Sequence, residues 1–455
     1  MEETKLRENK MGVLPIPKLL ISMSLPMMIS MLVQALYNVV DSVFVAQISE
    51  DALTAVSLAF PVQNLMIAIA AGTGVGINAL ISRYLGMKQF ETANKVARNG
   101  IFLGIASFLV FALLGAGAAH AFFGFQTDNQ TIVNYGTTYM RIISIFSIGI
   151  FLQVTFERLM QSTGKTIYNM ITQGTGAIIN IVLDPILIFG LFGFPRLEVA
   201  GAAIATIIGQ LVALTMSFYF NHAKNKELDI RMRGFRPDKQ IISQIYAIGV
   251  PSIIMQSIGS IMVFGMNKIL MMFSSTATAV FGVYFKLQSF VFMPVFGLNN
   301  GMIPIVAYNY GAGHKKRILD TIKLSVGIAV GIMLIGLLIF QLVPGELLRL
   351  FDASDHMLEI GIPALRIISL SFIFAGYCII IGSVFQALGN GVYSLIVSVA
   401  RQLLIILPVA YTFAMVFGLH MVWWAIPIAE IASVILSTLL FKRINRLKIK
   451  PLDEK

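Results

Sequence analysis

Long apolar runs fill most of this chain and leave room for little else. A helix needs about 20 apolar residues to cross the hydrocarbon core of a bilayer, and each run reaches that length. None of the runs alternates polar and apolar residues, as the strands of a membrane barrel do. We therefore expect membrane-spanning helices near residues 16–48, 52–85, 91–119, 132–157, 164–191, 197–220, 241–272, 276–310, 318–343, 358–385, 389–417 and 421–442.

The composition supports the same fold class. Of the 455 residues, 57% are apolar and 12% are charged, whereas a soluble globular domain carries roughly 25% charged residues. The mean hydropathy of +0.83 excludes a single core with a hydrated surface. The one cysteine, Cys378, excludes a disulfide framework. The sequence predicts an all-α polytopic membrane protein of twelve transmembrane helices.

The basic residues predict how the chain is oriented. If the N-terminus lies in the cytoplasm, most of the 33 Lys and Arg residues fall in inner segments, as the positive-inside rule requires. The outer segments then hold only Arg141, Arg196, Arg349 and Arg366. We expect a multi-pass protein of the cell inner (cytoplasmic) membrane with both termini cytoplasmic. The net charge of +11 then indicates attraction to anionic membrane lipid rather than binding of nucleic acid.

The sequence matches itself at an offset of 225 residues. Arg141-Ile-Ile-Ser144 recurs as Arg366-Ile-Ile-Ser369, and Gln161-x-x-Gly164-x-x-x-Tyr168 recurs as Gln386-x-x-Gly389-x-x-x-Tyr393. The same register pairs Pro26 with Pro251, Gln63 with Gln288, Gly76 with Gly301 and Gly86 with Gly311. One register held across both halves indicates an internal repeat.

Each half carries six spans, so both halves enter the membrane in the same sense. This predicts two six-helix bundles related by a pseudo-twofold axis along the membrane normal, as in transporters that work by alternating access. The expected divisions are an N-terminal bundle at 1–221, a cytoplasmic linker at 222–240, a C-terminal bundle at 241–443 and a cytoplasmic tail at 444–455. No gap between spans is long enough for a soluble catalytic domain. We expect neither an enzyme, a cofactor nor a metal site.

Charged residues inside the spans are the candidates for function, because burying them in a membrane is costly. Asp41 shares one helix face with Gln34, Tyr37 and Asn38, which are spaced at i, i+3, i+4 and i+7. Asp184 lies one turn beyond Asn180 in the fifth span, and Thr206 lies in the sixth. Both carboxylates come late in spans that run outward, so they are expected to share one cavity; two separately hydrogen-bonded acids are the alternative.

Two such carboxylates suit ion coupling. A poorly solvated carboxyl group close to another negative charge holds a proton more readily near neutral pH. Oxygen atoms of Tyr37, Asn38, Asn180 and Thr206 could instead complete a sodium site. The sequence leaves proton and sodium both open.

Three other charged residues are expected to have structural roles. Glu157, followed by Arg158 at an inner helix end, is expected to reach the membrane interface. Arg401 and Glu430 lie in the middle of the eleventh and twelfth spans and are expected to form an ion pair. A contribution of this pair to a cavity in the second half is the alternative.

The second half lacks counterparts of the first-half acids, because Met266 corresponds to Asp41 and Val409 to Asp184. It is instead rich in methionine, whose side chain adapts to varied apolar shapes; ordinary helix packing explains these residues equally well. The weakly indicated substrate cavity comprises Gln34, Met255, Gln256, Met266, Met293, Asn300, Arg401 and Glu430. Pro26, about four turns before Asp41, is expected to allow the first span to kink.

These residues resemble the multidrug and toxic compound extrusion (MATE) family, most closely its MepA-type bacterial branch. The resemblance rests on Pro26 with Asp41, on Asn180-x-x-x-Asp184-Pro185 and on Gln161-x-x-Gly164. It is supported by Gly301-Met-x-Pro304 and the following Tyr310-Gly311-Ala312. Some members carry coupling carboxylates in helices seven and eight, where this chain has none.

The resemblance implies antiport, in which an inward proton or sodium gradient drives export of bulky, often cationic or amphipathic aromatic drugs and dyes. It assigns Asp41, Asp184, Asn180, Tyr37 and Thr206 to the cation site. A monomer is expected. The alternative function is a flippase for lipid-linked precursors, which would need a strongly basic cavity, and here only Lys286 and Arg401 are candidates.

Overall fold

The computed structural model of the protein describes residues 9–454, and every regular element among them is helical. Ten helices are long and apolar enough to cross a membrane, and two further pairs reach that length if each bent pair counts as one span. The predicted all-α membrane protein is therefore confirmed, and the twelve predicted spans correspond to these ten helices and the two bent pairs.

The chain divides into two compact units, one continuous in sequence and the other built from two separate segments. One unit comprises Ile29–Gly249, and the other combines Met1–Met28 with Val250–Lys455. The boundaries thus fall inside two helices, α2 (Ile16–Ala46) and α9 (Lys239–Met271). The domain ranges expected from the repeat remain a prediction.

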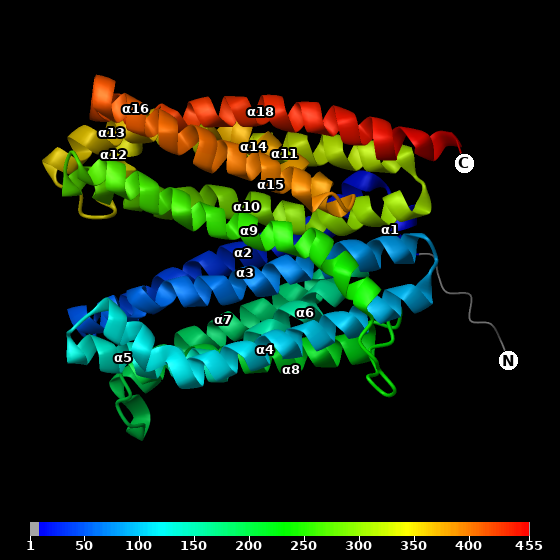
Figure 1. Ribbon diagram of the computed structural model, residues 1–455, viewed down its shortest axis with the longest axis horizontal. Helices are drawn as coiled ribbons and strands as arrows, with labels where there is room; N and C mark the ends of the chain where they lie inside the picture. Colours follow the sequence, from blue (N-terminus) through cyan, green and yellow to red (C-terminus); the bar gives the residue numbers. More distant parts are fainter. Residues whose placement is uncertain (1–8, 455) are drawn as a thin grey trace. The chain divides into compact units, whose positions relative to one another are not determined.

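The unit Ile29–Gly249 contains the second part of α2 and the first part of α9, with six helices between them (Figure 1). These six are α3 (Glu50–Gly86), α4 (Phe90–Gln126), α5 (Gln130–Ile145), α6 (Ile148–Ser162), α7 (Thr166–Phe189) and α8 (Val199–Lys224). Helices α5 and α6 form one bent pair, with an angle of 41° between them. Helices α7 and α8 pack closely because Gly176 lies against the Gly209 backbone.

The other unit has the same kind of helix order. Its long elements are α10 (Ser275–Ala312), α11 (Lys315–Leu342), α13 (Asp355–Ser369), α14 (Phe372–Ala387), α15 (Gly391–Val399), α16 (Leu407–Phe417) and α18 (Ala425–Ile444). The short helices are α1 (Lys10–Val13), α12 (Pro344–Arg349) and α17 (Leu419–Val422). Helices α13 and α14 bend by 48°, and a π-helical segment, Ala400–Ile406, joins α15 to α16.

In each unit, a glycine lets a long helix pack closely against the part of α2 or α9 that belongs to the same unit. Gly76 of α3 lies against the backbone carbonyl of Ile245 in α9. At the repeat-equivalent position, Gly301 of α10 lies against the backbone of Ser24 in α2. The Ser24 hydroxyl donates a hydrogen bond to the Leu298 carbonyl at 3.3 Å. A side chain at either glycine would collide with the neighbouring backbone, so this close packing depends on glycine.

A pair of carboxylates and a buried ion pair

Asp41 and Asp184 come together inside the unit Ile29–Gly249, as the sequence predicts. Asp41 lies on the last turns of α2 and Asp184 on those of α7, and the two carboxyl groups are close enough to interact electrostatically. Asp184 is fully buried. Two carboxyl groups share a hydrogen bond only when one of them carries a proton, because ionised carboxylates are acceptors only. A proton shared between the two groups, or another cation bound beside them, neutralises such a pair.

Polar groups from α7, α8 and α2 lie next to this pair. The Asn180 side chain lies between Asp184 and Thr206, and the orientation of its amide that satisfies both neighbours gives Asp184 Oδ2 a hydrogen bond of 3.1 Å. In this orientation the Asn180 oxygen accepts a hydrogen bond from Thr206 Oγ1, also at 3.1 Å. The Tyr37 hydroxyl lies in the same neighbourhood, where it interacts with Asp41, Thr206 and Asp184. Asn180 and Thr206 are nearly completely buried, so this network is shielded within the bundle.

The close approach of α7 to α8 explains how these residues meet. The backbone of Gly209 lies against Gly176, and this glycine contact is only one helical turn from Asn180. An aromatic pair, Phe44 of α2 and Phe189 of α7, packs edge to face at 6.4 Å beyond the two acids. The site is thus fixed by glycine packing on one side and by aromatic packing on the other.

Not every predicted residue joins the network. Gln34 and Asn38 lie on the exposed side of α2, and no side-chain hydrogen bond joins either residue to the acids within residues 9–454. Pro26 is buried inside α2 and lies two residues before the boundary between the units. The helical spacing placed these residues on one face, but only Tyr37 and Asp41 turn toward α7 and α8.

Tyr139 and Gln63 belong to the same neighbourhood and were missed in the sequence. Tyr139 of α5 is 2% exposed, interacts electrostatically with Asp41 and Asp184, and contacts Gln63 of α3 at 3.5 Å. Gln63 stands out in the sequence only through its match to Gln288 in the repeat. A tyrosine in an apolar span carries no comparable signal.

The expected ion pair between Arg401 and Glu430 is present in the second unit. Arg401 Nη1 lies 2.7 Å from Glu430 Oε1, and the Glu430 side chain is 6% exposed. Arg401 lies in the π-helical segment Ala400–Ile406, where the wider backbone turn redirects side chains. The pair neutralises both charges, which fits a structural role.

The remaining predicted cavity residues are divided between the two units. Met255, Gln256, Met293 and Asn300 are half-buried within the unit that contains residues 250–455, whereas Gln34 belongs to the other unit. Met266 is fully buried, so we leave it out of the proposed cavity. Lys286 lies 5.9 Å from the centre of the Phe351 ring, which satisfies its charge in part.

The expectation that Glu157 reaches the membrane interface is wrong. Glu157 is 3% exposed and lies within α6, where neighbouring side chains donate hydrogen bonds to its carboxylate. Hydropathy could not reveal this, because the donors come from α7 as well as from α6.

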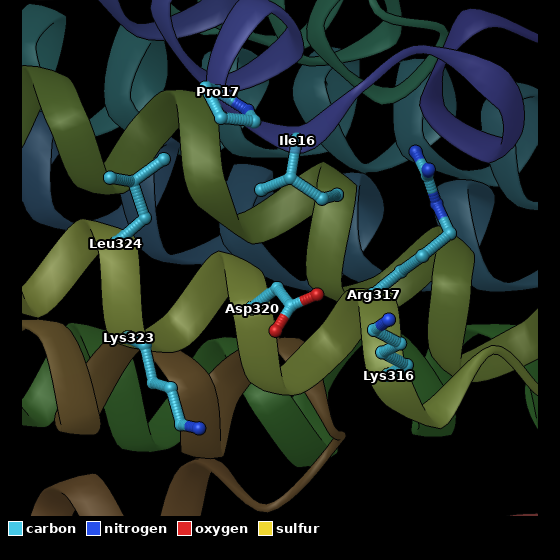
Figure 2. Close-up of a pocket in the computed structure, with 7 residues that line it drawn as sticks. All are labelled: Ile16, Pro17, Lys316, Arg317, Asp320, Lys323 and Leu324. Atoms are coloured by element: carbon cyan, nitrogen blue, oxygen red, sulfur yellow. The ribbon is translucent and has the colours of Figure 1, made fainter.

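A surface pocket of about 680 Å³ lies near the beginnings of α2 and α11 (Figure 2). Its charged side chains do not converge: Arg317 and Lys323 point in opposite directions in Figure 2. Arg317 donates hydrogen bonds to the carbonyls of Met11 and Leu14, each at 2.8 Å. Arg317 therefore anchors the start of the described chain rather than a ligand.

Residues 9–454 contain no cluster of His, Cys, Asp and Glu suited to a metal ion.

Comparison with known proteins identifies the family. The MatE family model matches residues 26–186 and again residues 251–412, so it finds both halves of the repeat. Multidrug export protein MepA of Staphylococcus haemolyticus is 28% identical over 436 residues, which cover 95% of each chain. Its counterpart from Staphylococcus aureus strain MRSA252 is 27% identical over 419 residues, with 91% of each chain covered.

Solved structures agree with this relationship. A MATE protein in complex with MaL6 has a TM-score of 0.91 and 26% identity, with 99% of this chain and all of that chain covered. A multidrug resistance MATE family transporter of the MOP superfamily, in an outward-facing conformation, also has a TM-score of 0.91, with 27% identity and both chains fully covered. The chain described here belongs to the MatE family of membrane transporters.

Proposed function

We propose that this protein exports bulky, often cationic aromatic compounds by antiport against an inward proton or sodium gradient. The observation that carries the proposal is the contact between Asp41 and Asp184 inside a membrane-spanning bundle. A bound cation neutralises such a pair, whereas without a cation the two negative carboxylates repel each other. Cation binding and release can therefore favour different conformations, as alternating access requires.

The cation site consists of Asp41, Asp184, Asn180, Tyr37 and Thr206, with Asn38 at its exposed edge. A proton shared by the two carboxyl groups would neutralise the pair, and a sodium ion bound by carboxylate, amide and hydroxyl oxygens would do the same. The relatives named multidrug export proteins support drugs and dyes as the substrates. The half-buried methionines and amides of the second unit, with Gln34, supply an adaptable lining.

The setting of this activity follows from the sequence. The protein acts as a monomer in the inner (cytoplasmic) membrane, with both termini in the cytoplasm and lipid around its apolar helices. The bundles at 1–221 and 241–443 alternate access to the cavity. The flippase alternative is less well supported, because Arg401 is neutralised by Glu430 and Lys286 lies against Phe351.

Ethidium efflux from energised cells that lack their own pumps tests the proposal. Wild-type protein is expected to export ethidium, whereas Asp184→Asn at matched expression falls to the background of cells without the transporter, since an amide cannot take up a proton. Asp128→Asn, which removes an exposed carboxylate from the same unit, serves as the control and keeps wild-type efflux. Separate collapse of the proton and sodium gradients identifies the driving ion. Absence of wild-type efflux for every cationic dye would contradict the proposal.

A further inference from the structure

Glu157 is a buried carboxylate to which the proposed coupling site assigns no role. It lies in α6, and its side-chain partners come partly from the first turns of α7. Asp184 lies near the other end of α7. Since a helix rises 1.5 Å per residue, the eleven residues from Gln173 to Asp184 separate the two sites by about 16 Å. Glu157 is therefore a second acid site within the same unit.

Three neutral side chains hold the Glu157 carboxylate. Gln153 Nε2 donates to Oε1 at 3.1 Å, and Thr172 Oγ1 donates to the same oxygen at 3.0 Å. Gln173 Nε2 donates to Oε2 at 2.7 Å. Asn169 fixes the backbone by donating to the Glu157 carbonyl at 3.0 Å. These partners replace the hydration that a buried carboxylate loses.

Among residues 9–454, no Lys, Arg or His side chain forms an ion pair with this carboxylate. Arg158 is the one charged group whose field acts on Glu157, but its guanidinium donates to Gln161 Oε1 at 2.8 Å. Helices α3, α4, α7 and α8 pack against α6, and within residues 9–454 none of them brings a charged or titratable side chain to the carboxylate. The Glu157 carboxylate is thus held by hydrogen bonds from neutral side chains, with the charge of Arg158 nearby but directed to Gln161.

The Thr172 hydroxyl accommodates both protonation states. Its single hydrogen has two acceptors at 3.0 Å, Glu157 Oε1 and the backbone carbonyl of Asn169. When Glu157 is ionised, Thr172 donates to Oε1. When Oε1 carries a proton, Glu157 donates to Thr172 Oγ1, and the threonine hydrogen turns to the Asn169 carbonyl. The Glu157 carboxyl group and the Thr172 hydroxyl therefore keep hydrogen bonds in either state without movement of a heavy atom.

We infer that Glu157 is a second proton-binding site, which takes up and releases a proton separately from the pair formed by Asp41 and Asp184. Helix α7 joins the two sites, because it carries Thr172 and Gln173 near its beginning and Asn180 and Asp184 near its end. A proton at Glu157 therefore acts on the same helix that carries Asp184, one of the two coupling acids. The inference rests on the proposed function only for the role of this proton in transport.

Infrared difference spectroscopy of the purified protein tests the site without any substrate. On titration from about pH 9 to about pH 5, buried carboxyl groups that become protonated gain a carboxylic-acid C=O band. We expect one such band to disappear in Glu157→Gln and to persist in the double variant Asp41→Asn/Asp184→Asn. An unchanged spectrum in Glu157→Gln would show that Glu157 keeps one fixed protonation state, which would overturn the inference.

A pair of variants at Thr172 tests the geometry independently of Glu157. Thr172→Val removes the hydrogen-bond acceptor, so the Glu157 band is expected to move to higher frequency, whereas Thr172→Ser keeps the hydroxyl and the band position. A band that is indifferent to both changes would contradict the assigned hydrogen bond.

Transport measurements then assign the role. The rate of ethidium efflux is measured as a function of internal pH. In Glu157→Gln we expect one titration step of this profile to disappear, and an unchanged profile would exclude a role of the Glu157 proton in transport. If the wild type exports no dye at all, the proposed function fails while the infrared result still decides whether Glu157 binds a proton.

Discussion

Buried charge is handled in two different ways by individual residues of this protein. Asp41 and Asp184 are neighbouring groups of like charge, so a bound cation is needed to relieve the repulsion between them. Arg401 and Glu430 are opposite charges 2.7 Å apart, so they neutralise each other permanently. The first arrangement can switch with ion binding, whereas the second cannot, and this contrast separates a coupling site from a structural pair.

Replacing Arg401 by methionine tests the structural role of the ion pair. The change leaves the buried Glu430 carboxylate without its partner. This lowers the free energy of unfolding by about 3 kcal/mol or more. Thermal unfolding of the purified protein in detergent measures the loss. Arg349→Met is the matched control, because its ion pair with Glu346 is exposed and such pairs contribute little. Equal unfolding temperatures for the two variants would show that the Arg401 pair is not structural.

At the level of residues, the sequence identified the acids but not all their neighbours. Asp41, Asp184, Asn180 and Thr206 were found because charged and polar residues are rare in apolar spans. The location of Glu157 was predicted wrongly because its donors come partly from another helix, and hydropathy does not report such contacts. The same limit explains why Tyr139 was missed.

The helices themselves were largely predictable. Each of the twelve apolar runs corresponds to a helix, a bent pair or a chain of short helices, since length and hydropathy decide what can span a membrane. The bends were not predicted. The breaks at Phe146–Ser147 and at Leu370–Ser371 contain neither proline nor glycine, so no local signal marks them. Their positions depend on packing against neighbouring helices.

Glycine packing within α10 gives a test at the scale of a single element. In Gly301→Ala the new methyl group would lie 2.6 Å from Ser24 Cα, so α2 must shift and stability falls by about 1 to 3 kcal/mol. Thermal unfolding of the purified variant measures this effect. In Gly327→Ala the methyl group meets open space, and stability should be unchanged or slightly higher because alanine favours helix. Equal losses in both variants would argue against the close contact of α10 with α2.

The whole molecule keeps the repeat that the sequence predicts. The family model matches the two halves separately, and equivalent glycines perform equivalent packing in α3 and α10. The compact units, however, do not follow the repeat boundaries, because each repeat gives the first part of its first helix to the unit built mainly from the other repeat. An internal repeat shows which segments are similar in sequence but not which segments pack together. The exchange of these first half-helices between the units could therefore not be predicted.

Proline at the boundary between the units provides a test at the scale of the molecule. Pro26 lacks the amide hydrogen that would complete the helix, and α2 passes from one unit to the other just after it. We expect Pro26→Ala to stiffen α2 and to slow ethidium efflux while leaving the fold intact. Efflux rates at matched expression, with Pro61→Ala in α3 as the control, measure this effect. Equal rates for Pro26→Ala and the wild type would contradict a role for the kink.

The exchanged half-helices also determine the order in which the protein can be assembled during synthesis. Residues 29–249 can close as a unit only once the ribosome has made the first part of α9. Residues 9–28 are made before that unit, yet their packing partners in α10 are made more than 240 residues later. This segment must therefore wait for α10 before it can pack, and until then lipid or the insertion machinery must cover its apolar surface.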